Sequence, residues 1–269
     1  MSASPPAFDA VSLSVEDGIA RLALNRPDTL NALNDAMFRE IPIAIGHATM
    51  AGARALLLTG EGRGFCSGAD LVGSRFSAPT PEDQRELANR ASFEKVVTLV
   101  RALHEAPMPV VCAINGVAAG GGVGLALAGD VILMAGSARF VLTFVPKLGL
   151  VPDVSATWLM ARMAGRAKTL AASLLGDTIT AAEAERWGLV WRLVDDARLH
   201  EEAYAVCRRL ADGPRDAVVG TRRLVDAASE MPLGQHVLME RDIQCKLIGG
   251  PDFNEGVAAF REKRPARFR

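Results

Sequence analysis

Residues 115–124 read Asn-Gly-Val-Ala-Ala-Gly-Gly-Gly-Val-Gly, and they follow directly on the apolar, strand-like run Val110 to Ile114. Three successive glycines, Gly120 to Gly122, stand where a helix is expected to begin, so no Cβ covers the unpaired N–H groups of its first turn. Backbone N–H groups at a helix start bind an oxygen that carries negative charge. The stretch therefore predicts a strand, a turn and a helix whose N-terminus is an oxyanion site.

A second glycine-rich segment, Gly60 to Leu71, follows the apolar run Ala55 to Leu58 in the same way. It contains Ser67-Gly68-Ala69-Asp70, whose backbone could aim a second N–H group at the same oxygen. Two such amides form an oxyanion hole. The competing interpretation is that these glycines only let a helix pack closely.

Bulk composition favours one main domain with a helical tail, because 269 residues with 49% hydrophobic content build one large core but not several. The net charge is −1 and the basic residues are dispersed, so no nucleic-acid partner is expected. The four cysteines include no C-x-x-C pair, which favours free thiols in a reducing compartment. Met1 to Ala7 lacks the features of a signal peptide, and no apolar run reaches the ~18 residues of a membrane span. We therefore expect a cytoplasmic protein that does not cross a membrane.

Hydrophobic periodicity in the first half of the chain predicts an α/β fold. Residues 10–25 alternate as a β-hairpin, and a helix capped by Asn31 or Asn34 follows, with Pro42 interrupting its middle. Buried apolar strands are predicted at 55–59, 110–114 and 131–134. This alternation of strands and helices is typical of an α/β protein with buried strands.

The remaining segments are predicted to be mostly helical. Residues 72–92 are polar and predict a mobile loop, followed by a helix whose apolar period starts at Phe93. Thr180 to Glu183 match a capping box, and further helices are predicted at 197–212, 215–229 and 235–249. The basic segment Phe253 to Arg269 is either a solvated tail or an anion-binding one.

Several motifs with known chemistry are absent from the sequence. Neither glycine cluster matches the G-x-G-x-x-G fingerprint, and there is no G-x-x-x-x-G-K-[ST] phosphate loop, so a nucleotide is not indicated. Ser67 misses the G-x-S-x-G nucleophile elbow by one place, and Cys66 beside it is expected to be a packing residue. The four histidines have no ligand spacing, so no metal site is expected at His47, His104, His200 or His236.

The two glycine segments, taken with Gly149-Leu150-Val151-Pro152-Asp153 and Glu255 to Phe260, resemble the crotonase family, also called the enoyl-CoA hydratase/isomerase family. The likeness extends from Leu24-Asn25-Arg26-Pro27 to Pro265, nearly the whole chain. It is strongest to the branch of ring-epoxyphenylacetyl-CoA isomerases and Δ3,Δ2-enoyl-CoA isomerases.

The resemblance implies an α/β spiral of ββα turns, with a core at residues 1–200 and a helical trimerisation region at 201–269. It implies a homotrimer or a hexamer made of two trimers. It also implies an acyl-CoA thioester substrate from fatty acid or aromatic acid catabolism. No separate cofactor is expected, since CoA is part of the substrate.

The same resemblance implies which residues form the site. The oxyanion-hole amides would be the backbone N–H groups of Ala69 and Gly121. Relatives place a loop like Asn25-Arg26, with Leu30-Asn31-Ala32-Leu33, along the CoA adenine and phosphates, and they reach a neighbouring subunit's CoA with residues like Phe260 and Lys263. The residues expected to line the acyl-CoA site are Ser67, Ala69, Asp70, Leu71, Gly120, Gly121 and Phe144.

Both acids that hydratases of this family use are missing from the chain. The first would stand in the helix after the glycines, at Gly124, and the second in the loop Phe140 to Gly149, which contains no carboxylate and is one residue longer than usual. Asp153 is the remaining carboxylate near the expected site, where the isomerase branch carries an acid or base. A 1,3-proton shift needs only one group that removes and returns a proton, so the sequence predicts double-bond or ring-epoxide isomerisation through Asp153.

The sequence is also consistent with roles for the chain besides isomerisation through Asp153. Asp153 could only cap the helix that follows it, and Val154-Ser155-Ala156-Thr157 replaces a commoner glycine pair, which would reshape the pocket. An aspartate close by is the nucleophile in the aroyl-CoA dehalogenase branch. An enoyl-CoA hydratase and a non-catalytic acyl-CoA-binding homologue are two more functions that this family resemblance allows.

Overall fold

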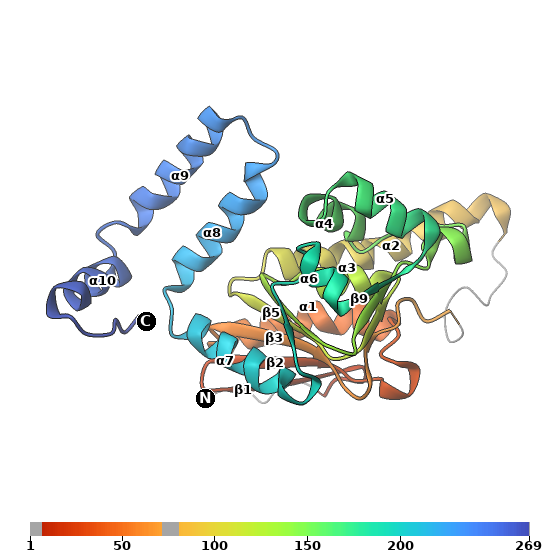
Figure 1. Ribbon diagram of the computed structural model, residues 1–269, viewed down its shortest axis with the longest axis horizontal. Helices are drawn as coiled ribbons and strands as arrows, with labels where there is room; N and C mark the ends of the chain where they lie inside the picture. Colours follow the sequence, from red (N-terminus) through yellow and green to blue (C-terminus); the bar gives the residue numbers. More distant parts are fainter. Residues whose placement is uncertain (1–6, 72–80, 269) are drawn as a thin grey trace.

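The computed structural model of the protein describes residues 7–71 and 81–268, and Figure 1 shows its architecture. Ten strands form two sheets in this part of the chain. The larger sheet has the strand order β1-β2-β3-β5-β7-β10, with the bounds Val11–Glu16, Ile19–Leu24, Ala55–Gly60, Val110–Ile114, Val131–Ala135 and Arg192–Val194. The smaller sheet has the order β4-β6-β8-β9, with the bounds Gly64–Cys66, Val117–Ala119, Arg139–Val141 and Thr178–Thr180.

From β3 to β8, successive strands alternate between the two sheets. β3, β5 and β7 each lie in the larger sheet, and the strand that follows each of them, β4, β6 or β8, lies in the smaller one. Neighbours in the larger sheet are parallel except for the β1–β2 hairpin. Because helices follow these strand pairs, the chain winds as a spiral of ββα turns, and the predicted α/β spiral is confirmed.

The helices that complete the core cover its buried strands. They are α1 (Asp35–Met50), α2 (Glu82–His104), α3 (Gly121–Leu127), α4 (Ala156–Met163), α5 (Arg166–Leu175), α6 (Ala181–Arg186) and α7 (Leu199–Ala211). Short helical turns occur at η1 (Pro27–Thr29), η3 (Phe144–Leu148) and η4 (Asp196–Arg198). Every residue of β3, β5 and α3 is buried, so these elements form the centre of the hydrophobic core.

The last three helices extend from this core as an arm (Figure 1). They are α8 (Arg215–Ala228), α9 (Leu233–Leu247) and α10 (Pro251–Glu262). The expected division of the chain at residue 200 falls inside α7, whose Ala203 and Cys207 are fully buried in the core. The arm itself therefore starts after α7.

The guanidinium of Arg222 in α8 fastens the arm to the core. It pairs with the carboxylate of Asp130 at 2.5 Å and donates to the carbonyl oxygens of His104, Ala106 and Met108. Only 9% of this arginine side chain is exposed. A hydrogen-bonded, largely buried ion pair of this kind fixes the direction in which the arm leaves the core.

Three expectations for helices need correction. The helix at the polar segment begins at Glu82 rather than near Phe93, because its first turns face solvent and carry no apolar period. Residues 82–92 of the loop predicted at 72–92 are therefore helical, and residues 72–80 lie outside the described residues. α1 continues through Pro42, because Met37, Ile41 and Ile45 pack on the core on either side of it. Residues 253–262 are not a tail but most of α10.

The remaining local predictions are confirmed. The hairpin turns at Asp17 and Gly18, both with positive φ, and Asn34, not Asn31, caps α1 by accepting from the Met37 N–H at 3.0 Å. Thr180 and Glu183 form the predicted capping box of α6. Among the described residues all four cysteines are free thiols.

Candidate active site

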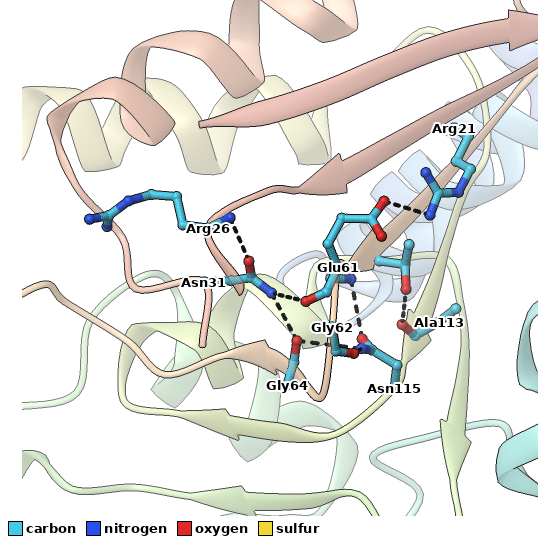
Figure 2. A network of polar contacts seen from close by, with 10 residues as sticks. Arg21, Arg26, Asn31, Glu61, Gly62, Gly64, Ala113 and Asn115 are labelled. Carbon is cyan, nitrogen blue, oxygen red and sulfur yellow. Dashed lines mark hydrogen bonds and ion pairs between the residues drawn. The ribbon is translucent and has the colours of Figure 1, made fainter. Parts of the chain in front are cut away.

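Two asparagine side chains hold the glycine-rich loops together (Figure 2). Asn115, at the end of β5, accepts from the Gly60 N–H at 3.2 Å and donates to the Gly62 carbonyl at 2.9 Å. A Cβ at Gly116 would overlap the Arg63 carbonyl oxygen, so the two loops touch through their backbones. Each side-chain amide replaces the ladder hydrogen bonds that these loop residues lack.

Asn31 is the second of these residues, and it is fully buried. Its carbonyl oxygen accepts from the Arg26 N–H at 2.8 Å, and its amide donates to the Glu61 and Gly64 carbonyls at 3.0 and 2.9 Å (Figure 2). The residue has φ +57°, in the left-handed region that asparagine tolerates better than most side chains. It therefore joins the η1 loop to the loop that leads into Ala69.

The segment around Ala69 pairs with Leu33, just before α1, and the Ala69 N–H points away from Leu33. The Leu33 N–H donates to the Gly68 carbonyl at 2.7 Å, and the Asp70 N–H donates to the Leu33 carbonyl at 2.9 Å. In a parallel bridge of this kind the intervening residue points its own N–H to the opposite side. Within the described residues no backbone carbonyl accepts from the Ala69 N–H, so that amide is available to a ligand.

Gly121 offers the second amide, because it is the first residue of α3 and its N–H has no intrahelical partner. Gly68 and Gly120 bring the two amides together. A Cβ at Gly68, which has φ +89°, would lie 2.7 Å from the Ala119 carbonyl oxygen and 3.4 Å from the Gly120 Cα. Only glycine permits this approach of the two loops, so both predicted oxyanion segments meet in space.

A cavity of about 360 Å³ opens beside the two amides. Its lining includes the predicted residues Ser67, Ala69, Asp70, Leu71, Gly120, Gly121, Phe144 and Asp153. Its walls are mainly apolar, and they come from α1, α2, the η3 turn and the segment before α4. This combination of apolar walls and a few convergent polar groups is that of a small-molecule site.

Asp153 lies directly against Gly121, the first residue of α3. Its Oδ1 is 3.1 Å from the position that a Cβ on Gly121 would occupy, and that oxygen is shielded from solvent. Two further lining carboxylates are engaged by cations: Asp35 pairs with Lys95 at 3.1 Å and Asp70 pairs with Arg26 at 2.9 Å. The 3.1 Å separation from a Cβ position on Gly121 places the Asp153 carboxylate at the N-terminus of α3.

A tight turn presents Asp153 to the cavity. The Ala156 N–H donates to the Asp153 carbonyl at 3.0 Å, and the two central residues, Val154 and Ser155, have φ +49° and +57°. Turns with two positive φ values favour glycine and asparagine, so a glycine pair at 154 and 155 would adopt this turn with less strain. The Ser155 hydroxyl donates to the Val154 carbonyl at 2.6 Å.

Neither Gly124 nor the loop Phe140 to Gly149, where the family resemblance places the two hydratase acids, contains a carboxylate. A Cβ at Gly124 would overlap the Val154 carbonyl oxygen, so this position has no room even for alanine unless the turn moves. Phe144 is buried against the cavity wall, with its Cζ 3.8 Å from a Cβ position on Gly120. The loop in which the sequence predicts one extra residue contains a π-helical turn, η3.

Five predicted binding residues do not line the cavity: Asn25, Arg26, Ala32, Phe260 and Lys263. Arg26 instead clamps the neighbouring backbone, donating to the Ala32 carbonyl at 2.6 Å and to Asp70 at 2.9 Å. Phe260 is 85% exposed in α10, and Lys263 ends that helix with φ +54°. In Figure 1, α10 lies at the opposite end of the molecule from α2, which lines the cavity. Within one chain, Phe260 and Lys263 are therefore separate from the cavity.

The sequence interpretation missed part of the cavity wall. Asn34, Asp35, Ala36 and Phe38 at the start of α1, and Phe93 and Val96 in α2, all line it. Phe93 is 44% exposed, and an exposed aromatic residue at helical spacing from a buried valine was the available signal.

Cys66 lies behind the site as a packing residue. Burial raises the pKa of its thiol to about 12, although a hydrogen bond from the Gly68 backbone acts in the opposite direction. A Cβ at Gly122 would lie 2.9 Å from the Cys66 Cβ, so this thiol stands under the first turn of α3. A group that stays protonated under these conditions is not a nucleophile.

Metal-binding clusters and membrane-spanning helices are both absent from residues 7–71 and 81–268. No three histidine, cysteine, aspartate or glutamate side chains there are grouped as a metal ion would require. Each helix of these ranges is too short or too polar to cross a membrane.

The chain is similar to known proteins over nearly its whole length. Residues 14–269 match the family model described as enoyl-CoA hydratase/isomerase. The chain is 40% identical to the 1,2-epoxyphenylacetyl-CoA isomerase of Escherichia coli K12, over 94% of this chain and 96% of that one. It is 38% identical to a protein of Rhodobacter capsulatus named a probable enoyl-CoA hydratase, over 97% and 98% of the two chains.

A solved structure gives the same result for the fold. The crystal structure of an enoyl-CoA hydratase from Bacillus anthracis superposes with a TM-score of 0.88 at 29% identity, covering 97% of this chain and 99% of that one. Matches of this extent leave no large part of the chain outside the likeness. The chain belongs to the enoyl-CoA hydratase/isomerase family.

Proposed function

We propose that this protein is an acyl-CoA isomerase that shifts a double bond, or rearranges a ring epoxide, in an enoyl-CoA thioester. The observation that carries the proposal is the position of Asp153 beside Gly121. Neither Gly124 nor the loop Phe140 to Gly149, where the family resemblance places the two hydratase acids, contains a carboxylate. The relative from Escherichia coli is named an isomerase of an epoxyphenylacetyl-CoA, which supports the same class of reaction.

The chemistry follows from one carboxylate and two amides. In a 3-enoyl thioester, ionised Asp153 takes a proton from Cα, and the electron pair moves into a dienolate whose charge rests on the thioester oxygen. The N–H groups of Ala69 and Gly121 stabilise that oxygen, and each such donor is typically worth about 3 kcal/mol in the barrier. Return of the proton from Asp153 to Cγ gives the 2-enoyl thioester and restores the carboxylate.

The cavity wall also agrees with an acyl group that has a flat or apolar end. Phe93 and Phe144 line it together with Leu148, Leu150 and Val96. Aromatic side chains favour a ring or a conjugated chain by offset stacking. The acyl group is therefore expected to be apolar, unsaturated or aromatic.

The test uses purified protein with cis-3-enoyl-CoA and with trans-2-enoyl-CoA, read by ultraviolet absorbance and mass spectrometry. We expect interconversion at constant mass, and an Asp153→Asn variant that loses about 100- to 10,000-fold in kcat while still binding the thioester. Asp177→Asn, an exposed aspartate away from the cavity, is the matched control and keeps full activity.

Two outcomes would contradict the proposal. A mass gain of one water in the wild-type reaction would indicate a hydratase. If the protein binds cis-3-enoyl-CoA, trans-2-enoyl-CoA and a ring-epoxide CoA thioester tightly but converts none of them, it is a non-catalytic acyl-CoA-binding protein.

We propose further that the arm is a self-association region, as expected for a homotrimer or a hexamer of two trimers. It exposes large apolar side chains, which is unusual for a surface that faces solvent. Val225, Leu233 and Phe260 are 67%, 78% and 85% exposed. Light scattering after size exclusion should give the mass of three or six chains, and a monomer mass at micromolar concentration would overturn this assignment.

A further inference from the structure

Gly124 and Val154 pack against each other more closely than any side chain at position 124 would allow. A Cβ on Gly124 would overlap the Val154 carbonyl oxygen and would lie 3.0 Å from the Val154 Cβ. The Val154 Cγ2 also reaches to 2.9 Å from a Cβ position on Gly121. The valine therefore covers two successive turns of α3 by backbone and side chain together.

The conformation of Val154 is unfavourable on its own. It is a β-branched residue with φ +49°, and such residues rarely adopt the left-handed region. A conformation of this kind persists only where the surroundings hold it. Here the surroundings are the glycine face of α3 below, the Ser155 hydroxyl bonded to the Val154 carbonyl, and the turn closed from Asp153 to Ala156.

The height of this turn above α3 sets the position of the Asp153 carboxylate, because Asp153 precedes Val154 directly. We infer that Gly124 and Val154 are positioning residues for Asp153. Because Gly121 and Gly124 have no side chains, Val154 packs directly on the backbone of α3, and this contact places the Asp153 carboxylate beside the Gly121 amide. The catalytic part of this inference rests on the proposed function of Asp153, whereas the geometric part does not.

One consequence is that the two possible acid positions exclude each other. A side chain at position 124 would need the space that the Val154 carbonyl now fills, so it would lift the turn and move Asp153. A glutamate at 124 and an aspartate at 153 in its present place would not fit together on this backbone. The packing of this turn on α3, and not only the sequence, then excludes a glutamate at 124 while Asp153 keeps its present place.

The test is Gly124→Ala, with Gly46→Ala as the matched control. Gly46 is an exposed helical glycine in α1 whose Cβ would meet nothing within 4 Å. We expect Gly124→Ala to lower kcat for 3-enoyl-CoA isomerisation about 100-fold, since displacement of a catalytic group by about 1 Å has that effect. The dissociation constant for butanoyl-CoA should stay within about threefold, and Gly46→Ala should match the wild type in both.

A double variant tests the proposed contact directly. Glycine at 154 accepts many more backbone conformations, so Gly124→Ala/Val154→Gly should regain about tenfold in kcat over Gly124→Ala. If Gly124→Ala does not fold, Val154→Gly alone should lower kcat about tenfold without weakening butanoyl-CoA binding, because the turn loses its side-chain hold on α3. An unchanged kcat in Gly124→Ala overturns the inference. If Gly124→Ala does not fold, an unchanged kcat in Val154→Gly overturns it.

Crystal structures separate this inference from the proposed function. Residues 153–155 should be displaced in Gly124→Ala and in place in Gly46→Ala. If the wild type proves inactive as an isomerase but the displacement is seen, the reaction assignment fails and the positioning geometry stands. If kcat falls while Asp153 keeps its place, the positioning role is wrong.

Discussion

The Arg26 guanidinium and the Asp70 carboxylate are 2.9 Å apart at the back of the segment that carries Ala69. The same guanidinium donates to the Ala32 carbonyl at 2.6 Å, so one side chain ties the η1 loop to the oxyanion segment. Only 23% of the arginine side chain and 10% of the aspartate side chain are exposed, so the pair is largely shielded from solvent. This ion pair, called the Arg26–Asp70 brace below, therefore holds the backbone next to Ala69 in place.

Arg26→Lys should separate the Arg26–Asp70 brace from a role in binding CoA phosphates. Lysine keeps the charge but lacks the planar fork that reaches two acceptors, so the Ala69 segment should loosen. We expect kcat to fall about tenfold, the free energy of unfolding to fall by about 2 kcal/mol, and the dissociation constant of the thioester to change little. A strong, salt-dependent loss of binding with kcat intact would instead place Arg26 on the CoA phosphates.

Asn31 offers a way to separate a hydrogen-bond effect from a backbone effect. Asn31→Gly removes three hydrogen bonds but suits φ +57°, and Asn31→Ala removes the same bonds and adds strain. Loss of partners for the buried carbonyls should cost about 1–3 kcal/mol in both variants, and alanine should cost roughly 1 kcal/mol more. Urea denaturation checks this order, and equal stability of the two variants would contradict the role assigned to the positive φ.

His104 should make the stability of the protein depend on pH. Burial lowers the pKa of its imidazole, outweighing the attraction of Asp226, and the ring stands edge-on to Trp158 at 5.8 Å. The unfolded chain takes up a proton near pH 6.5 while the folded chain does not, so the free energy of unfolding falls as the pH drops below about 6.5. In urea titrations at pH 7.5 and 5.5, His104→Gln should lose less stability on acidification than the wild type. Equal losses would show that His104 is not the cause.

Cys66 should resist alkylation in the folded protein. Its thiol is buried and its pKa is raised to about 12, so little thiolate is present at pH 8. Iodoacetamide followed by peptide mapping should leave Cys66 unmodified in the native state and modify it in urea. Rapid modification of Cys66 in the native protein would require access from the cavity that the packing under α3 excludes.

Local sequence signals were sufficient where one residue type dictates the backbone. The glycines of both loops, the capping box at Thr180 and the hairpin at Asp17-Gly18 were all found in this way, because each depends on neighbours in sequence. The family resemblance singles out Asp153, and the structure places it in the cavity lining with Ala69 and Gly121. Its catalytic role stays a prediction.

The features missed are those that depend on distant partners. The strands of the smaller sheet have only three residues each, so no alternation is detectable, and pairing across turns of the spiral creates them. The first half of α2 is exposed and has no apolar stripe to detect. The close contact between Gly124 and Val154 joins residues thirty positions apart in the sequence, and no pattern in either segment predicts it.

The place of β10 in the larger sheet matters for chain truncation. Its three residues pair with Leu133, Met134 and Ala135 and cover the last edge of a buried, apolar strand. A chain that stopped before Arg192 would keep all the glycines of the site and Asp153, yet it would leave β7 with open backbone donors and acceptors beside apolar side chains. Such an edge recruits strands from other molecules. A fragment with every residue that lines the cavity would thus be expected to aggregate, because it would lack β10 at this edge and α7, which packs on β3 and β5, although neither element lines the cavity.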